Sequence, residues 1–333
     1  MKKISRRNFV GIAAAGGAAF ASGMLAACGS KCPIKDEYTA AGVKKFRMKF
    51  APRGLFRASS HGNPFKRLKF LADNGFTAVE GLVFCNPKKP YKQEDMDKQT
   101  ALGAYAKELG LAMGCISSMN EKDFPVMTAN QVPVKDRVIR GKKEVRDCLK
   151  SQLEITLGVM ERLGSKTFII GPGIADKELP AEKQYENVVE NMSFCADFCK
   201  RNGVVMEIEP LNTKSHPNMY CDRAVLGARI VRDVNNPHCR LLYDIFHEYM
   251  QTGSTETLDD PDVWDCIESF HMADAPSRNE PGTGVIDYKK ILGKIWAKGY
   301  RGFIGLEHGQ TDKTVAGDMK LLEIYRELDS AAS

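Results

Sequence analysis

Four residues whose side chains commonly ligate metal ions each stand at the end of a short apolar run in the C-terminal half of the chain. They are Glu209 in VVMEIEPLN, Asp244 in LLYDIFHEY, His271 in FHMAD and Glu307 in FIGLEHG. A single Asp or His at such a position is more often a turn former or a helix cap. The same placement four times in succession favours a shared site.

The chemistry of these four side chains indicates a cation. Three carboxylates brought together would repel and raise one another's pKa unless a positive charge neutralised them. Three oxygen donors and one imidazole suit Mn²⁺ best, with Mg²⁺, Co²⁺ and Zn²⁺ as alternatives. A thiolate zinc site is not expected, because the sequence contains no CxxC motif. We therefore predict a divalent metal site bound by carboxylates and one histidine.

The chain from about residue 46 onward alternates short apolar runs with longer amphipathic stretches, which is typical of strand–helix units. Eight such units predict one α/β domain, residues 46–330, with a (β/α)8 TIM barrel fold. An open doubly wound sheet is the competing architecture, but residues 51–62 (APRGLFRASSHG) lack its G-x-G-x-x-G motif. The predicted strands are 46–50, 78–83, 112–117, 167–171, 204–210, 240–245, 267–273 and 303–307.

A barrel would bring the four candidate ligands together. Neighbours in the set are separated by about one strand–helix unit, and barrel enzymes carry their chemistry where the strands end, at one rim. Glu207, two residues before Glu209, should point to the same side of its strand but deeper in the barrel. We expect it to be a hydrogen-bonded core carboxylate, unless the register differs by one residue.

The segments between the strands predict helices, several of which end beside a glycine suited to a left-handed C-cap. The largest insertion, residues 117–144, follows the third strand, and a long loop there could cover the active site as a lid. The predicted helices are 64–74, 100–109, 142–163, 185–201 and 224–234.

The N-terminus is typical of a targeting segment, because Lys and Arg residues precede a mildly apolar, Gly/Ala-rich run. The stretch SRRNFV resembles a twin-arginine export signal, and LAAC resembles a lipobox with Cys28 as the lipidated residue. We expect residues 1–27 to be removed and residues 28–45 to form a tether. The protein would then be lipid-anchored on the periplasmic side of a bacterial membrane. An ordinary membrane anchor is the alternative, but glycines interrupt the run.

Charge and cysteine usage limit the partners. Residues 1–27 hold four basic and no acidic residues, so the formal charge of the remainder falls from +6 to +2. Its Lys and Arg residues are scattered among acidic ones, so no nucleic-acid partner is expected. The ten cysteines are widely spaced and many lie in apolar surroundings, which favours buried thiols over disulfides.

These motifs resemble those of the xylose-isomerase-like barrels, and most closely the hydroxypyruvate isomerases, over about residues 65–328. The resemblance is strongest in GFTAVEG (75–81), EPLN (209–212), YDIFH (243–247), HMADAPSRNEPGTGVIDY (271–288) and GLEHG (305–309).

The resemblance implies roles for the matching residues. Glu209, Asp244, His271 and Glu307 would be the metal ligands, with Glu209 and Glu307 also acting as the acid/base pair. His247 would contact a substrate hydroxyl, and Arg278 would bind a substrate oxygen or carboxylate. Hydroxypyruvate isomerases commonly have glutamine in place of His271, whereas the related ketose epimerases have histidine.

The implied activity is a metal-dependent aldose–ketose isomerisation through a cis-enediolate, acting on a small keto acid or keto-sugar. Contact with the membrane would occur only through the N-terminal lipid, and the protein could form a homo-oligomer. Three alternatives are a keto-sugar 3-epimerase or related sugar isomerase acting outside the cytoplasm, a non-catalytic carbohydrate-binding lipoprotein, and an endonuclease IV type nuclease. The six histidines and the low net charge argue against the nuclease.

Overall fold

A computed structural model describes residues 37–86, 91–118, 126–134 and 137–332. The predicted signal peptide, its twin-arginine motif and Cys28 lie outside the described residues. The predicted tether is described only from residue 37 onward. There, Tyr38 and Lys44 form an isolated antiparallel bridge, and Arg326 donates a hydrogen bond to the Lys44 carbonyl.

The strands form the predicted parallel barrel. Seven of them are hydrogen-bonded in the order β1-β11-β10-β9-β8-β7-β4, and β2 pairs with β3. A parallel bridge between Arg53 and Glu80 joins the ends of β1 and β2, and β3 is followed directly by β4. The strands are β1 (Lys49–Pro52), β2 (Ala78–Val79), β3 (Ala112–Met113), β4 (Ile116–Ser117), β7 (Thr167–Ile170), β8 (Val205–Ile208), β9 (Cys239–Asp244), β10 (Ile267–Met272) and β11 (Phe303–Leu306).

The (β/α)8 prediction is confirmed, and each predicted strand segment contains a strand, with differences of detail. The first strand begins at Lys49 rather than at residue 46, and the second ends at Val79 rather than at residue 83. The third predicted strand is divided into β3, which pairs with β2, and β4, which pairs with β7.

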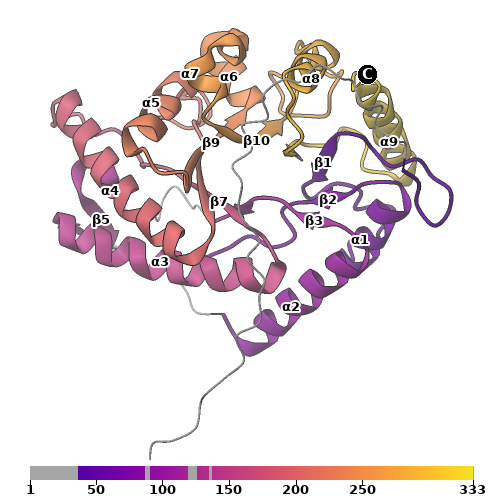
Figure 1. Cartoon of the computed structure of the whole chain (residues 1–333), viewed down its shortest axis with the longest axis horizontal. Helices are drawn as coiled ribbons and strands as arrows, with labels where there is room; N and C mark the ends of the chain where they lie inside the picture. The colour runs from indigo at the N-terminus through magenta and orange to yellow at the C-terminus, as the bar shows by residue number, and fades with distance from the viewer. Residues whose placement is uncertain (1–36, 87–90, 119–125, 135–136, 333) are drawn as a thin grey trace, which may run out of the picture. The chain divides into compact units, whose positions relative to one another are not determined.

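Helices surround the strands (Figure 1). Asn63 caps α1 by accepting hydrogen bonds from the backbone of Phe65 and Lys66, and α3 and α4 end at Gly164 and Gly203 in the left-handed conformation. The helices are α1 (Pro64–Asp73), α2 (Gln93–Glu108), α3 (Lys142–Leu163), α4 (Ala181–Asn202), α5 (Ala224–Val234), α6 (Ile245–Thr252), α7 (Pro261–Trp264), α8 (Tyr288–Ala297) and α9 (Val315–Asp329), with 3-10 turns η1 (Met127–Ala129) and η2 (Glu256–Asp259).

Two helix starts were predicted too late. Helix α2 begins at Gln93 rather than at residue 100, and α4 begins at Ala181 rather than at residue 185. The first turns of both helices are polar, so they carry little of the apolar periodicity on which the prediction rested. Acidic residues in these first turns, such as Glu94 and Glu182, are stabilised there by the positive N-terminal end of the helix dipole.

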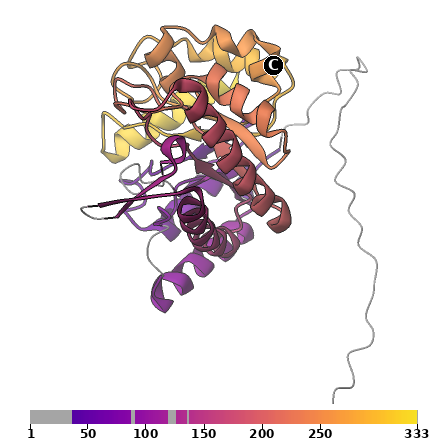
Figure 2. The same ribbon diagram turned by 90° about the vertical axis from the view of Figure 1, so that its left-hand side faces the viewer.

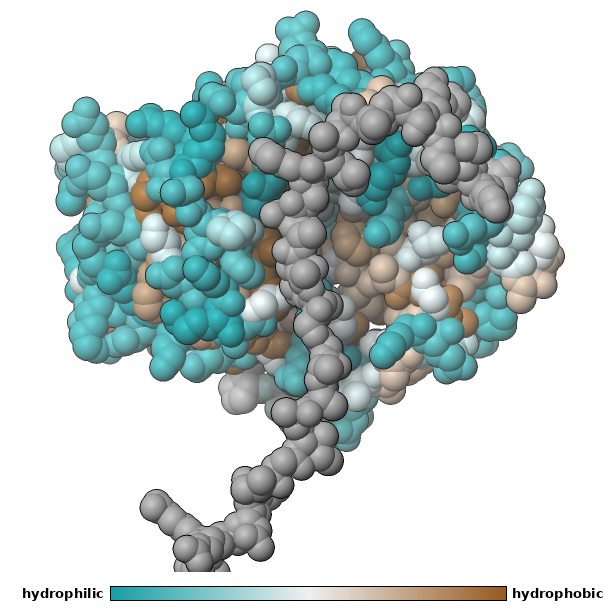
Figure 3. All heavy atoms as spheres, viewed as in Figure 1, coloured by the Kyte–Doolittle hydropathy of each residue, from teal (hydrophilic) through white to brown (hydrophobic). Residues whose placement is uncertain are grey.

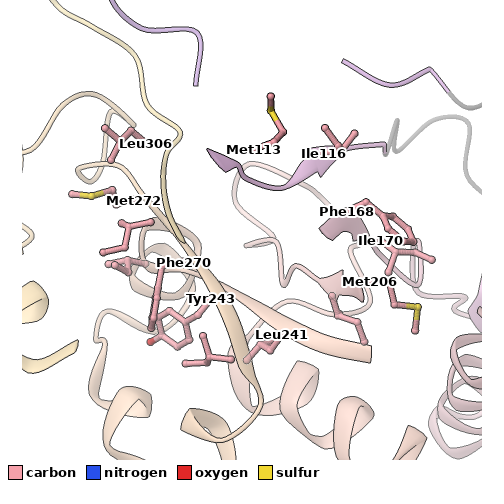
Figure 4. Close-up of a cluster of buried hydrophobic side chains, with 14 of the residues drawn as sticks. Met113, Ile116, Phe168, Ile170, Met206, Leu241, Tyr243, Phe270, Met272 and Leu306 are labelled. Atoms are coloured by element: carbon pink, nitrogen blue, oxygen red, sulfur yellow. The ribbon is translucent and has the colours of Figure 1, made fainter. Parts of the chain in front are cut away.

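Alternation along the strands separates the core from the barrel interior. Side chains such as Phe168, Met206 and Phe270 point outward and form the buried layer that Figure 4 shows. Cys115, Ile169 and Leu242 form a separate small apolar cluster.

The prediction that Glu207 is a hydrogen-bonded core carboxylate is confirmed. It is fully buried and accepts a hydrogen bond from Ser269 Oγ of β10. Burial raises the pKa of Glu207 to about 8, despite the hydrogen bond from Ser269. This carboxyl group lies one inward-facing position below Glu209 on the same strand.

The insertion after β4 forms a hairpin, β5 (Gln131–Val134) with β6 (Arg137–Arg140), which projects from the rest of the barrel in Figure 2. Asn187 and Asn191 of α4 donate hydrogen bonds to the carbonyls of Thr128 and Met127 in η1. These contacts hold the described start of the insertion against α4, and residues 119–125 lie outside the described residues, so the lid over the active site stays a prediction.

The surface visible in Figure 3 is mostly hydrophilic between scattered apolar residues. Among the described residues, no helix is long and apolar enough to cross a membrane. All described cysteines are free thiols, and all except Cys148 are buried, as predicted.

Candidate metal centre and active site

The four predicted ligands converge at the C-terminal ends of four successive strands. Glu209 follows β8, Asp244 ends β9, His271 lies in β10, and Glu307 follows β11. One potential ligand atom from each lies within 4.8 Å of every other. We call this set the carboxylate–histidine cluster. The structure thus brings together every residue that the sequence singled out as a metal ligand.

Two atoms of the cluster lack hydrogen-bond partners although they are buried. They are Nδ1 of His271 and Oε1 of Glu209, which lie 3.5 Å apart. Buried polar atoms without partners are rare, and each calls for a ligand, a water molecule or an ion. Nδ1 of His271 also lies 2.8 Å from Oε2 of Glu307. A shared cation would satisfy all of these atoms.

The charged groups around the cluster leave a net negative charge that one divalent cation would neutralise. Two arginines approach the carboxylates: Arg53 Nη1 lies 2.9 Å from Glu307 Oε1, and Arg278 Nη2 lies 3.0 Å from Asp244 Oδ2. Together with Glu80 and Glu209, four carboxylates face two guanidinium groups. With the imidazole of His271 neutral, as a metal ligand must be, the excess is two negative charges, and such an excess in a buried site is costly unless compensated. The donor set therefore fits a divalent metal ion.

The two glutamates occupy different electrostatic surroundings. Burial raises the pKa of Glu209, and the nearby Glu307 carboxylate raises it further, against the attraction of the neighbouring His271. Burial alone would also raise the pKa of Glu307, but Arg53, His271 and Arg278 outweigh it and hold this pKa well below its usual range. Surroundings that separate two carboxyl pKa values are typical of an acid/base pair.

A cavity of about 240 Å³ opens onto the cluster. Its polar wall includes Glu209, Glu307, His247 and Arg278, and Arg53 also faces it. The apolar wall comes from Phe84, Ile169 and Leu211. The structure therefore places both predicted substrate-binding residues, His247 and Arg278, beside the predicted metal ligands. A larger cavity of about 460 Å³ between residues 280–289 and α9 receives none of the cluster residues.

His247 lies between Asn212 and Arg278, with Arg278 Nη1 2.8 Å from its Nε2. Burial lowers the pKa of His247 to about 4, and the positive charge of Arg278 adds to this effect against the opposing charge of Asp244. The ring is therefore neutral near pH 7.

Asp274 holds the loop that carries Arg278. Its carboxylate accepts hydrogen bonds from the backbone N–H groups of Ala275, Gly282, Gly284 and Ile286. A Cβ at residue 284 would lie 2.6 Å from Asp274 Oδ1, so only glycine fits there. Along the motif HMADAPSRNEPGTG, His271 belongs to the cluster, Asp274 holds the loop through its hydrogen bonds, and Arg278 faces the cavity.

Sequence reasoning missed two residues of the site, Glu80 and Arg53. Glu80 Oε1 lies 2.8 Å from His271 Nε2, and Arg53 bridges Glu80 and Glu307. Both stand just after short apolar strands, β2 and β1. The rule that found the other four, a polar residue at the end of an apolar run, would have found them if applied to the N-terminal half.

The chain belongs to the xylose isomerase-like TIM barrel family, whose model matches residues 68–325. It is 28% identical to hydroxypyruvate isomerase of Escherichia coli (strain K12) over 165 residues, which are 49% of this chain and 63% of that enzyme. It is 25% identical to 2-oxo-tetronate isomerase of Pectobacterium atrosepticum over 252 residues, which are 75% of this chain and 88% of that enzyme.

Solved structures agree on the fold. An L-ribulose 3-epimerase superposes with a TM-score of 0.60 at 21% identity, covering 85% of this chain and 91% of that one. At this identity the likeness shows the barrel alone. The similarity to these isomerases supports an isomerase or epimerase at distant identity.

Proposed function

We propose that the protein is a metal-dependent aldose–ketose isomerase of the hydroxypyruvate isomerase type, acting through a cis-enediolate with Glu209 and Glu307 as the acid/base pair. The observation that carries the proposal is the convergence of the carboxylate–histidine cluster on the cavity that His247 and Arg278 line. We propose Mn²⁺ as the resident ion, because the donor set combines three carboxylates with one imidazole.

The chemistry divides between the ion and the chain. When bound, the cation would hold two adjacent oxygens of a hydroxy-ketone and acidify the C–H between them. Glu307, whose pKa is held low, is suited to remove that proton as a general base. Glu209, whose pKa is raised, is suited to return a proton to the neighbouring carbon. For hydroxypyruvate, this transfer from C3 to C2, together with transfer of the hydroxyl proton from the C3 oxygen to the C2 oxygen, gives 2-hydroxy-3-oxopropanoate.

Arg278 and His247 orient the substrate. Arg278 presents a planar guanidinium to the cavity, which matches a carboxylate or a pair of oxygens. The neutral imidazole of His247 lines the same cavity, where a hydroxyl of the substrate would compete with Arg278 for its Nε2. A small keto acid uses both contacts, and the 25–28% identity to hydroxypyruvate and 2-oxo-tetronate isomerases supports this substrate class.

A keto-sugar 3-epimerase is the second candidate. The residue that favours it is His271, because the family resemblance implies histidine at this position in ketose epimerases and commonly glutamine in hydroxypyruvate isomerases. The same two glutamates would serve, with the proton returned to the original carbon from the opposite face. The predicted location outside the cytoplasm also favours a substrate that is found there.

Solvent exchange tests the proposal. The Mn²⁺-loaded protein is incubated in D₂O with hydroxypyruvate, 2-oxo-tetronate and a panel of keto-sugars, and deuterium uptake and products are followed by NMR. We expect exchange and isomerised product with a keto acid. Exchange that yields a keto-sugar epimer would replace this proposal by the epimerase. No exchange with any compound, despite bound metal, would contradict both and favour a non-catalytic carbohydrate-binding protein.

A further inference from the structure

The second ring nitrogen of His271 is bound to a residue outside the cluster. His271 Nε2 lies 2.8 Å from Oε1 of Glu80, and both side chains are almost completely buried, at 0% and 1% exposure. The other nitrogen, Nδ1, faces Glu307 and Glu209. One ring nitrogen of His271 therefore faces the cluster, and the other contacts Glu80.

We propose that Glu80 is a positioning residue of the metal centre: by accepting the Nε2–H of His271, it leaves the Nδ1 lone pair directed at the cation. This inference rests on the proposed metal site. A neutral imidazole carries one proton, and the partner of one nitrogen decides which nitrogen is free to ligate. Carboxylate partners of this kind fix the tautomer and the ring orientation of a metal-binding histidine and raise its basicity.

The neighbouring strands are built around this contact. Gly305 of β11 is the register partner of His271, and a Cβ on it would lie 2.4 Å from His271 Cδ2 and 2.8 Å from Glu80 Oε2. Gly114, between β3 and β4, would place a Cβ 3.1 Å from the same Glu80 oxygen. Real Cβ atoms essentially never approach closer than 3.0 Å, so any side chain at Gly305 would displace the pair. The absence of a side chain at Gly305 lets residues from β2 and β10 meet across β1 and β11.

Arg53 compensates the buried charge of this arrangement. Its Nη1 lies 3.5 Å from Glu80 Oε1 and 2.9 Å from Glu307 Oε1. A buried carboxylate with only a neutral partner would be costly, and a nearby cation offsets that cost. Arg53 thereby connects Glu80 to a cluster residue, so the three strand ends β1, β2 and β11 hold one network around His271.

If Glu80 had a purely structural role, its replacement would leave the metal affinity and the His271 tautomer of the folded protein unchanged. The test therefore measures both quantities directly. The variants are Glu80→Ala, Glu80→Gln and Gly305→Ala. The control is Glu248→Gln, because Glu248 is also a buried carboxylate but bonds Ala224 and Thr257, away from the cluster. Mn²⁺ dissociation constants are measured by competition with a chelator, and the Zn²⁺-loaded protein labelled with ¹⁵N-histidine reports the tautomer by NMR.

We expect the Mn²⁺ dissociation constant to rise about 10-fold in Glu80→Gln, whose amide oxygen still accepts a hydrogen bond, and up to about 100-fold in Glu80→Ala. Gly305→Ala should weaken binding as well, and Glu248→Gln should leave it unchanged. In the wild type, His271 should carry its proton on Nε2, and Glu80→Ala should lose this preference.

Wild-type affinity and tautomer in both Glu80 variants would overturn the positioning role while leaving the metal site intact. If Glu80→Ala does not fold, the same result in Glu80→Gln alone would overturn it. A wild-type protein that binds no divalent cation would instead overturn the metal site, and the positioning role with it.

Discussion

Arg278 Nη2 lies 2.9 Å from Glu307 Oε2, so the residue proposed to bind the substrate also contacts the proposed general base. The same nitrogen contacts Asp244, and the guanidinium stacks over the Phe246 ring at 4.7 Å. A planar fork can hold these contacts and still present donors to the cavity, whereas an ammonium group cannot. The loop clamped by Asp274 therefore couples substrate binding to the acid/base pair.

Replacing Arg278 by Lys is expected to raise KM and lower kcat/KM by about 10- to 100-fold, because charge-assisted hydrogen bonds of this kind contribute roughly 1.5–3 kcal/mol. Steady-state kinetics on the keto acid that shows exchange would measure it. Arg223→Lys is the control, since Arg223 pairs with Asp222 on the exposed surface. An unchanged KM in Arg278→Lys would remove Arg278 from the substrate site.

Replacing Glu209 or Glu307 by Gln should each lower the rate of solvent exchange by about 10²–10⁴-fold, because each variant lacks one of the two proton-transfer groups. Circular dichroism and metal content are recorded in parallel, to separate loss of chemistry from loss of fold or ion. Glu268→Gln, which changes a glutamate paired with Arg240 instead, should retain full activity. Full activity in either of the first two variants would refute the acid/base assignment.

The buried thiol of Cys199 predicts a loss of stability at alkaline pH. Burial raises its pKa from 9.0 to about 12 in the folded protein. Between these values the unfolded chain has lost the proton and the folded chain has kept it, so the free energy of unfolding falls as pH rises. This thiol alone contributes up to about 1.4 kcal/mol per pH unit.

Urea unfolding of the wild type and of Cys199→Ala from pH 8.5 to pH 11 measures this slope. We expect the variant to be less stable at pH 8.5, because it loses buried sulfur, but to show a shallower decline with pH. Parallel declines in the two proteins would show that the Cys199 thiol ionises as readily in the folded state as in the unfolded chain.

The proposed export route predicts a specific requirement for Arg6 and Arg7, which lie outside the described residues. Replacing both by Lys preserves charge but removes the paired arginines, so precursor should accumulate inside the cell. Cys28→Ala should abolish lipidation and release the exported protein from the membrane fraction. Cell fractionation and immunoblotting measure where each variant is found. Normal export of the double Lys variant would contradict the twin-arginine proposal.

The sequence was sufficient to predict the barrel and the carboxylate–histidine cluster because both follow from strand periodicity. Each cluster residue ends an apolar run, and the parallel barrel aligns those ends at one rim. Glu207 was placed correctly for the same reason, since side chains two residues apart on a strand share a face.

The parts that were not predicted depend on contacts between strands distant in sequence. The pair of Glu80 and His271 spans nearly two hundred residues, and no local pattern shows that Gly305 leaves room for it. The hairpin of residues 131–140 was also missed, because Pro133 and the charged residues of β6 conceal its alternation.

We propose that Glu209, Asp244, His271 and Glu307 bind one divalent cation beside the cavity. Anomalous diffraction from crystals grown with Mn²⁺ would locate this ion. We expect one strong manganese peak within about 2.0–2.4 Å of a ligand atom from each of the four residues. No peak there, or a peak bound elsewhere while these side chains keep their ion pairs to Arg53 and Arg278, would show that the four residues do not form a metal site.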